Sequence, residues 1–587
     1  MNSKRIFAVL TAIAVLLAVL VSCAETGDVS GTPSPGSSPG SADSQENAEF
    51  REFTETFLVS EYMMATYGIH DDFKIPENFG FPADYAVAWC VGEAYSDEVY
   101  EAFMADSAAR LAEFGYDSLN ADQKIVYSLL EYNFRNFSES LDTEYYDEYL
   151  IPGTGMHMMI PIILSEYKLQ RERDITDRIY LIETVGELLS EIAEYESERS
   201  ARGFFMTDDA LDTVLEECAA FIADPGGNML ITSFDEEMSA LGFDLDDALR
   251  AEYTERNRLA VLDKLIPAYE EFMTAIEAFR GTGVNTAGLV GLPLGREYIA
   301  LRLKIMGLSY TPEEYIQKID DALAADINEL IRIITGDYDA VSRIETLGFP
   351  GKPAEEIIEF LKSAAVSDFP ALSPGTEFKV NYVDKSQEEA ARPAMYLPPQ
   401  VDYPEGNVIK VNNLYAESDA SGFFTTLAHE GYPGHLQQFA GLRASDASLV
   451  RKLQNYQANT EGWATYAELY SAKYLGDDKN AIDLIRLDSE LNLLMSGRVE
   501  MGVNYEGWTL DDVEDFLAEY GFSAYADVFY DLMVSSPLIY VMYVGGWLEF
   551  VDLRAAHPEM SDLEFHTACL DAGIVPFSIL ADRLGGT

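Results

Sequence analysis

The stretch from His429 to His435 reads HEGYPGH, and the interpretation of the whole chain starts from it. It holds two of the 6 histidines in the sequence, and Glu430 directly follows the first of them. Imidazole and carboxylate groups are ligands that zinc favours, and a catalytic zinc site has three protein ligands plus a water. The stretch therefore predicts a metal site in which His429 and His435 are two of the ligands.

The spacing of the two histidines requires a break in the helix that carries them. In the familiar HExxH arrangement, a spacing of four residues brings both histidines to one helix face, whereas here Pro433 stands at that position. On a straight helix, the longer spacing leaves His429 and His435 roughly 120° apart. Pro433 removes a backbone donor and clashes with the preceding turn, and Gly434 permits unusual dihedrals. We therefore predict a break here that returns His435 to the side of His429.

A third ligand is expected from the next helix, which we predict from about Leu449 to Leu475, with Gly476 after its end. Glu461, in the run TEGWATYAE, is the first choice. Glu468 lies about two turns later on the same face. It is therefore either a partner that orients a ligand histidine or the third ligand itself.

Glu430 is the expected general base of this site. It follows a ligand in the chain but points away from the ion, towards the bound water. Zinc lowers the pKa of a bound water to about 7, and the carboxylate of Glu430 takes up its proton during attack. This pattern predicts a hydrolase that acts through a zinc-activated water.

The rest of the body is predicted to be mainly helical, with one small β element. Thr311, Thr509 and Ser561 each begin a capping pattern that marks a helix start. The runs FKVNYV (378–383) and VIKV (408–411) predict a strand pair immediately before the metal motif. An edge strand beside a metal site can hold an extended peptide by main-chain hydrogen bonds. The alternative is a structural hairpin that only covers the core.

Composition sets further limits on function. The chain has 587 residues, 48% of them hydrophobic, which is enough for a large core. Its formal net charge of -62 repels phosphate backbones, so nucleic acid is excluded as a partner. The 4 cysteines are too few and too widely spaced for a disulfide framework or a cysteine-rich zinc motif.

The start of the chain has the pattern of an export signal. Two basic residues precede an apolar run from Ile6 to Val21, which ends in Ser22-Cys23 and resembles a bacterial lipobox. The alternative is a single transmembrane anchor. Residues 27–42 are rich in Gly, Ser and Pro, as in a flexible tether. We therefore expect a signal peptide (1–22), a lipidated Cys23 with its tether (23–47) and a helical zinc hydrolase domain (48–587).

At its central motifs the chain resembles the bacterial domain-of-unknown-function family 885. The family signature is His-Glu-x-x-Pro-Gly-His followed by Glu-Gly-Trp-Ala-x-Tyr, and it matches residues 429–435 and 461–466. The likeness covers most of the body from about residue 50 onwards. This family is similar to zinc peptidases of the gluzincin kind, which have largely helical bodies. The resemblance implies that His429, His435 and Glu461 are the ligands and that Glu430 is the base.

Several other positions differ from the family pattern or resemble it. Leu436 and Asn504 stand where members carry histidine, and Glu500 stands where they carry aspartate. Tyr543, in a stretch that resembles the family, is a candidate donor to the oxyanion of a tetrahedral intermediate. For Arg498 we prefer an ion pair over a contact with substrate, and for His566 a structural role.

Together these observations predict a mainly α protein: a large helical metallopeptidase-like body with a small β element beside the active-site cleft. The expected function is zinc-dependent hydrolysis of short peptides outside the cytoplasmic membrane, with attachment to the membrane only through the N-terminal lipid. A zinc amidase acting on cell-wall or small-molecule amides is the alternative enzyme. The non-enzymatic alternative is a ligand-binding lipoprotein with a structural metal. The sequence does not indicate an oligomeric state.

Overall fold

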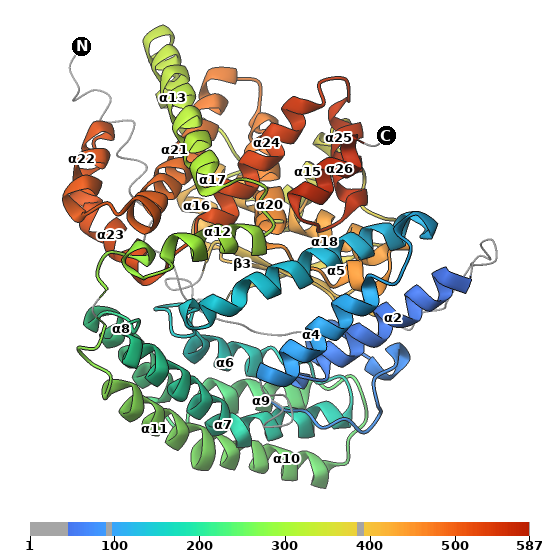
Figure 1. Cartoon of the computed structure of the whole chain (residues 1–587). Helices are drawn as coiled ribbons and strands as arrows, with labels where there is room; N and C mark the ends of the chain where they lie inside the picture. The colour runs from blue at the N-terminus through green and yellow to red at the C-terminus, as the bar shows by residue number, and fades with distance from the viewer. Residues whose placement is uncertain (1–44, 90–96, 284, 384–391, 586–587) are drawn as a thin grey trace.

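The computed structural model describes residues 45–89, 97–283, 285–383 and 392–585, and within them the fold is mainly helical (Figure 1). The predicted signal peptide, Cys23 and most of the predicted tether lie outside these residues. The first described helix begins at Gln45, so the predicted domain boundary at residue 48 falls inside it. Across the described ranges, no helix is both long and apolar enough to cross a membrane.

The elements form three groups along the chain. The N-terminal group consists of α2 (Gln45–Tyr62), α3 (Ile69–Asp72), α4 (Asp97–Leu111) and α5 (Ala121–Ser140). The middle lobe consists of α6 (Met156–Ser165), α7 (Glu172–Arg202), α8 (Asp208–Ile222), α9 (Met229–Ser239), α10 (Asp247–Ala260) and α11 (Ile266–Glu277). The main lobe begins with α12 (Gly295–Ile305), α13 (Pro312–Gly336), α14 (Ala340–Arg343), α15 (Ala354–Ala364), β1 (Phe378–Tyr382), β2 (Ala394–Leu397) and β3 (Asn407–Val411). It continues with α16 (Leu414–Ser418), α17 (Ala420–Glu430), α18 (His435–Ala444), α19 (Leu449–Lys452), α20 (Gln457–Ser471), α21 (Lys479–Met501), α22 (Leu510–Tyr520), α23 (Ala526–Ser535), α24 (Gly546–Ala556), α25 (Asp562–Ala572) and α26 (Phe577–Gly585).

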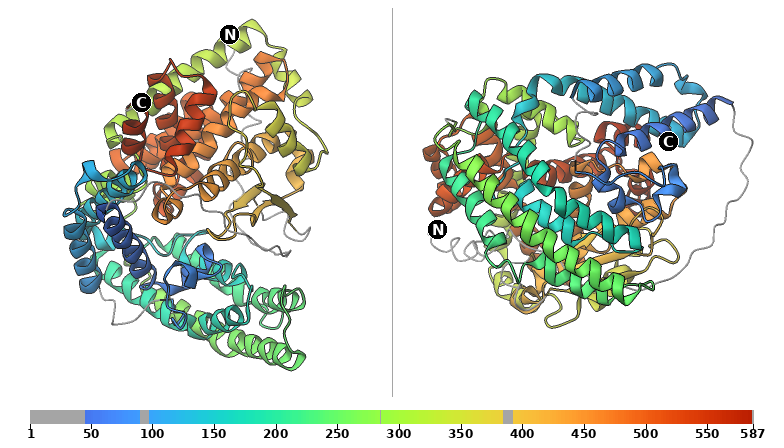
Figure 2. Two further views of the ribbon diagram at one scale, coloured as in Figure 1. Left: turned by 90° about the vertical axis from the view of Figure 1, so that its right-hand side faces the viewer. Right: turned by 90° about the horizontal axis from the view of Figure 1, so that it is seen from below.

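The middle and main lobes bury separate hydrophobic cores. Ile179 and Phe234 belong to the core of the middle lobe, and Leu427 and Trp463 belong to the core of the main lobe. Each lobe therefore has its own source of stability, since apolar burial is the dominant favourable term in folding. The small sheet belongs to the main lobe and faces the middle lobe across the boundary between them (Figure 2, left view).

The helix starts predicted from capping patterns are confirmed. Thr311, Thr509 and Ser561 each accept a hydrogen bond from the backbone N–H three residues later, and the acidic residue at that position bonds back. These reciprocal bonds satisfy donors that the first helical turn leaves free. The capped helices α13, α22 and α25 all belong to the main lobe.

The single helix predicted from 449 to 475 is interrupted. α19 ends at Lys452, α20 begins at Gln457, and the last turn, Ala472–Leu475, is a 3-10 helix. Tyr456 takes an extended conformation (φ -89°, ψ 104°) and donates its hydroxyl to Asn133 of α5 at 2.6 Å. The N–H of Ala458 donates to the carbonyl of Met306. These tertiary contacts override the local preference for a continuous helix.

The two predicted strands pair with each other, but as parallel neighbours. β1 pairs in parallel with β3, and a third strand, β2, pairs antiparallel with the other side of β3. The simple hairpin is therefore wrong, because a tight turn joins only antiparallel strands. β2 is an edge strand that comes from the stretch between the two predicted runs.

Candidate metal centre

The helix that carries HEGYPGH ends where the sequence has proline and glycine. α17 ends at Glu430 and α18 begins at His435, because Gly431 and Gly434 leave helical geometry with ψ angles of -122° and -128°. The N–H of Gly434 donates back to the carbonyl of Ala428 at 2.9 Å. The chain therefore turns back over the last turn of α17 before α18 starts.

Three side chains of ligand type meet at this break. The rings of His429 and His435 have centroids 4.9 Å apart. Glu461, on α20, places its Oε2 3.6 Å from Nε2 of His429 and 3.5 Å from Nε2 of His435. One donor atom from each of the three residues lies within 4.8 Å of the other two. The structure thus brings together the two histidines and the carboxylate that the sequence analysis selected.

Close helix packing sets the position of Glu461. A Cβ on the adjacent Gly462 would lie 2.3 Å from the backbone carbon of Gly546, so α20 and α24 touch with almost no side chain between them. The indole N–H of Trp463, the residue after Gly462, donates to the carbonyl of Pro433 at 3.0 Å. α20 is thereby fixed both to α24 and to the break that carries the histidines.

Glu468 lies on the far side of His429. Its Oε2 is 3.0 Å from Nδ1 of His429, whereas Glu461 faces Nε2 of the same ring. A ligand histidine commonly donates its second ring nitrogen to a carboxylate, which fixes its tautomer and orientation. Glu468 therefore contacts Nδ1 of His429, whereas Nε2 of the same ring and Glu461 face the common centre.

The contacts between the histidines and the carboxylates shift the pKa values of His429 and Glu461. Burial lowers the pKa of His429, but its hydrogen bonds with Glu461 and Glu468 outweigh burial and raise the pKa well above its ordinary value. Burial raises the pKa of Glu461, yet the two histidines hold it well below the usual range. Glu461 is therefore ionised at neutral pH, and an ionised carboxylate is the form that binds a cation.

Glu430 extends from the end of α17 towards the sheet. Its Oε2 accepts a hydrogen bond from the backbone N–H of Tyr396 at 2.8 Å. Tyr396 belongs to β2, so this N–H points away from β3 and towards the free edge of the strand. The carboxylate of Glu430 thus lies between the ligand cluster and an unpaired strand edge.

Tyr543 lies on a π-helical turn, Val541–Gly545, that packs against α20. Burial raises the pKa of the Tyr543 hydroxyl above its ordinary value, the charge of Glu461 raises it further, Arg392 opposes the shift, and Glu430 adds to it. The hydroxyl is therefore neutral and available as a donor, within electrostatic reach of both carboxylates.

Two features of this neighbourhood were missed by the sequence analysis. The N–H of Tyr396 contacts Glu430, and Arg392 lies close enough to influence Tyr543. The available signal was the alternating run Ala394–Leu397 directly after a proline, which reads as an edge strand.

Other singled-out residues are structural in this fold. His566 is fully buried, stacks on Phe369 with centroids 4.0 Å apart, and contacts the carbonyl of Asp368 at 2.6 Å. Arg498 pairs with Asp320 and Glu506, as preferred from the sequence.

The two family positions that depart from histidine also lie inside the protein. Leu436 is fully buried. Asn504 accepts from the N–H of Leu289 and donates to the carbonyl of Met533, each at 2.9 Å. Neither residue belongs to the ligand cluster.

The substitution Gly434→Ala is expected to destabilise the chain by about 3 kcal/mol, through backbone overpacking. A Cβ at Gly434 would lie 1.8 Å from the carbonyl oxygen of His429, which cannot move without opening the break. Urea unfolding measures the change. The control Gly441→Ala, on α18, meets nothing within 4 Å and is expected to stabilise by about 1 kcal/mol. Equal effects of the two substitutions would contradict this account of the break.

Comparisons with known proteins agree with this fold. The sequence model of a family described as "Bacterial protein of unknown function (DUF885)" matches residues 91–584. A crystal structure of a candidate lipoprotein from Colwellia psychrerythraea has a TM-score of 0.78 at 18% identity, covering 92% of this chain and 99% of that one. A candidate lipoprotein of unknown function from Shewanella oneidensis has a TM-score of 0.61 at 16% identity, covering 91% of this chain and 99% of that one. No match was found among curated proteins.

Proposed function

The chain belongs to the DUF885 family of bacterial proteins, and from that premise we propose that it is a zinc-dependent peptidase of gluzincin type that acts on short peptides. The observation that carries the proposal is the convergence of His429, His435 and Glu461, with Glu430 beside them. Two imidazoles and one carboxylate are a ligand set found in catalytic zinc sites of metallopeptidases.

The separations within the cluster fit a zinc ion. Tetrahedral bonds of the usual zinc lengths place neighbouring ligand atoms roughly 3.4 Å apart. The two imidazole nitrogens lie 3.6 and 3.5 Å from the same oxygen of Glu461. Three protein ligands leave a fourth position for water or substrate, which is the arrangement of a catalytic rather than a purely structural site.

Each residue around the centre has a defined task in this reaction. A bound zinc supplies a polarised carbonyl and a water of lowered pKa. Glu430 takes the proton of the attacking water and passes it to the leaving amine. Glu468 orients His429 through Nδ1, and the hydroxyl of Tyr543 donates to the carbonyl oxygen as negative charge develops on it.

The free edge of β2 supports a peptide as the substrate. An extended peptide can add to an exposed strand edge through main-chain hydrogen bonds. This edge carries the N–H of Tyr396, which already meets Glu430. A peptide that continued the sheet here would therefore run past the carboxylate that removes the proton.

We also propose that the protein works outside the cytoplasmic membrane. The basic start, the apolar run and Ser22-Cys23 have the pattern of a lipoprotein signal, and both structural neighbours are described as candidate lipoproteins. Mass spectrometry of the N-terminal peptide tests this directly. The expected product begins at a diacylated Cys23, and an unmodified Met1 in the exported chain would contradict it.

Metal analysis of the purified chain, with peptide hydrolysis as a second measurement, tests the proposed function. We expect one zinc ion per chain, and cleavage of a short-peptide mixture that stops on chelation and returns with zinc. A chain that binds no zinc, or one that binds zinc but cleaves no peptide, would overturn the peptidase proposal. In the latter case, cleavage of amides by the same preparation would favour the zinc amidase instead.

Glu468→Gln is expected to weaken zinc binding ten- to a hundredfold, because a partner that orients a ligand histidine contributes on that scale. Competition with a fluorescent chelator measures the affinity. Glu559→Gln is the matched control, since the exposed Glu559 likewise contacts Nδ1 of a histidine, His557, at 3.2 Å. That variant should bind zinc as the unmodified chain does. Complete loss of zinc in Glu468→Gln would instead make Glu468 a ligand.

A further inference from the structure

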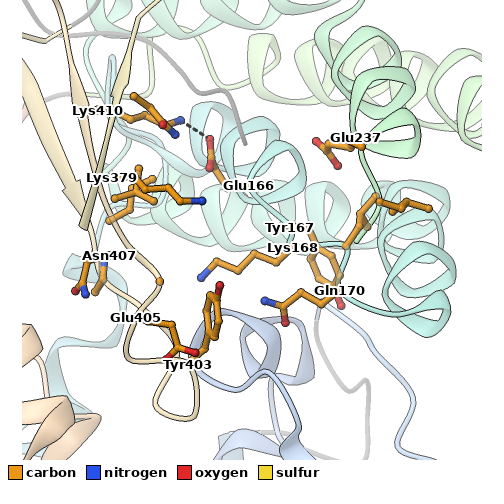
Figure 3. A pocket seen from close by; sticks show the side chains of 18 of the residues that line it. Glu166, Tyr167, Lys168, Gln170, Glu237, Lys379, Tyr403, Glu405, Asn407 and Lys410 are labelled. Atoms are coloured by element: carbon orange, nitrogen blue, oxygen red, sulfur yellow. Dashed lines mark hydrogen bonds and ion pairs between the residues drawn. The ribbon is translucent and has the colours of Figure 1, made fainter. Parts of the chain in front are cut away.

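A cavity lies near the candidate metal centre, between the middle lobe and the main lobe (Figure 3). Its volume is about 290 Å³. One wall is the connection from α6 to α7 (166–170), another is α9, and the third is the face of the sheet that points away from the main-lobe core. Leu241, Leu397 and Val408 give it an apolar part.

The cavity reaches β2, the strand whose backbone contacts Glu430. Leu397 lines it and directly follows Tyr396, whose N–H contacts Glu430. From β2 the cavity extends over β3 to Lys379 on β1. Strands lie about 4.8 Å apart, so this crossing spans roughly 10 Å.

Three of the charged groups that line the cavity are already neutralised. Lys410, on β3, is buried and pairs with Glu166 at 2.8 Å. Glu237, on α9, pairs with the fully buried Arg178. The first pair ties the middle lobe to the sheet, the second lies within the middle lobe, and neither leaves a free charge for a ligand.

Lys168 and Lys379 differ from these pairs. They come from opposite walls, and their ammonium groups point into the same space (Figure 3). Neither forms an ion pair with any residue that the structure describes. Desolvation lowers the pKa of Lys168, and the charge of Asp71 opposes that shift without contact. The cavity therefore holds two ammonium groups that have no ion-pair partner among the residues with a described position.

The acids near these lysines do not take that role. Glu236 and Glu405 also line the cavity, and Glu405 lies beside Tyr403 at its lower end in Figure 3. The charges of Asp72 and Glu166 also act on Lys168, but Asp72 contacts Arg443 and Glu166 contacts Lys410. An incoming carboxylate would be the direct partner that both ammonium groups lack.

We propose that Lys168 and Lys379 form a carboxylate-binding subsite that selects short peptides carrying a negative charge. The inference rests on the proposed peptidase function. The carboxylate can come from the C-terminus of the peptide or from an acidic side chain. In a chain of net charge -62, recognition of an anion has to come from such a local contact, because the long-range field repels it.

Binding to the zinc-loaded Glu430→Gln variant tests the subsite without any need for catalysis. Four penta-alanine probes with acetylated N-termini are compared by calorimetry. One has a free C-terminus, one is amidated with a glutamate at position four, one is amidated and neutral, and one is amidated with a lysine at position four. We expect the probes with a carboxylate to bind about tenfold more tightly than the neutral one, and the lysine probe to bind no better than the neutral one. The first two probes distinguish the two sources of the carboxylate.

Removal of the lysine charges should abolish this preference. Lys168→Gln combined with Lys379→Gln is expected to bind all four probes within about twofold of one another. Lys264→Gln, an exposed lysine outside the cavity, removes one charge elsewhere and should keep the preference. A preference that survives in the double variant, or that is absent from the parent, would overturn the subsite.

The experiments distinguish failure of the carboxylate subsite from failure of the peptidase proposal. Charge-selective binding that depends on the lysines, in a chain that never cleaves a peptide, would keep the subsite and reject the peptidase. Cleavage of neutral and acidic peptides at equal rates would reject the subsite alone.

Discussion

Glu430→Gln is expected to lower kcat/KM for peptide hydrolysis about a thousandfold while the chain keeps its zinc. General acid–base catalysis contributes on this scale, and the amide of glutamine cannot take up a proton. The amide oxygen can still accept the hydrogen bond from the N–H of Tyr396, so the position of the side chain should be retained. The measurement is steady-state hydrolysis together with metal analysis of the same preparation.

A ligand variant separates the role of a base from the role of a ligand. His429→Ala should lose zinc and activity together, because it removes one of the three converging donors. Glu430→Gln should lose activity alone. If Glu430→Gln also lost its zinc, Glu430 would be a ligand; if it stayed active, another group would be the base.

Much of the candidate site was predictable because its geometry depends on local sequence. Pro433 and Gly434 predict a helix break, and this break brings His435 back to the side of His429. Glu461 and Glu468 share a face because their spacing is about two helical turns. The choice between them needed the structure, since only the structure shows which ring nitrogen of His429 each carboxylate meets.

The remainder depends on contacts between residues far apart in the chain. β2 is a run of only 4 residues, and its role follows from its pairing with β3 and from the contact of Tyr396 with Glu430. The interruption before α20 follows from the contact of Tyr456 with α5. The cavity that contains Lys168 and Lys379 lies between two lobes with separate cores, so no local sequence pattern links these two lysines.

The placement of Tyr543 is another long-range effect. The turn that carries it is held by Glu500, which is fully buried and accepts from the N–H of Tyr540 at 3.0 Å. Burial raises the pKa of Glu500 to about 8, and hydrogen bonds from the backbone N–H groups of Tyr540, Val541 and Ile539 oppose that shift. Several backbone N–H groups at the start of the π-helical turn therefore donate to the carboxyl group of Glu500. Because Glu500 belongs to α21, these hydrogen bonds fix the start of the turn relative to that helix.

Tyr543→Phe is expected to reduce kcat about a hundredfold with KM and zinc content nearly unchanged. One donor to a developing oxyanion contributes on this scale, because it strengthens as charge forms on the carbonyl oxygen. Loss of the hydroxyl leaves the ring, so the packing of the turn against α20 should persist. Steady-state kinetics on one peptide, with the thermal midpoint as a check on folding, measures the effect.

Tyr470→Phe is the control for the loss of a hydroxyl on the helix that also carries Glu461. Its hydroxyl donates to Asp562 at 2.7 Å, away from the ligand cluster, so its kcat should stay within about twofold of the parent. If Tyr543→Phe lowers kcat less than threefold, Tyr543 serves packing. If the substitution changes KM alone, Tyr543 serves substrate binding. The oxyanion would then need a different donor, and Arg392, whose charge already acts on Tyr543, is the next side chain to replace.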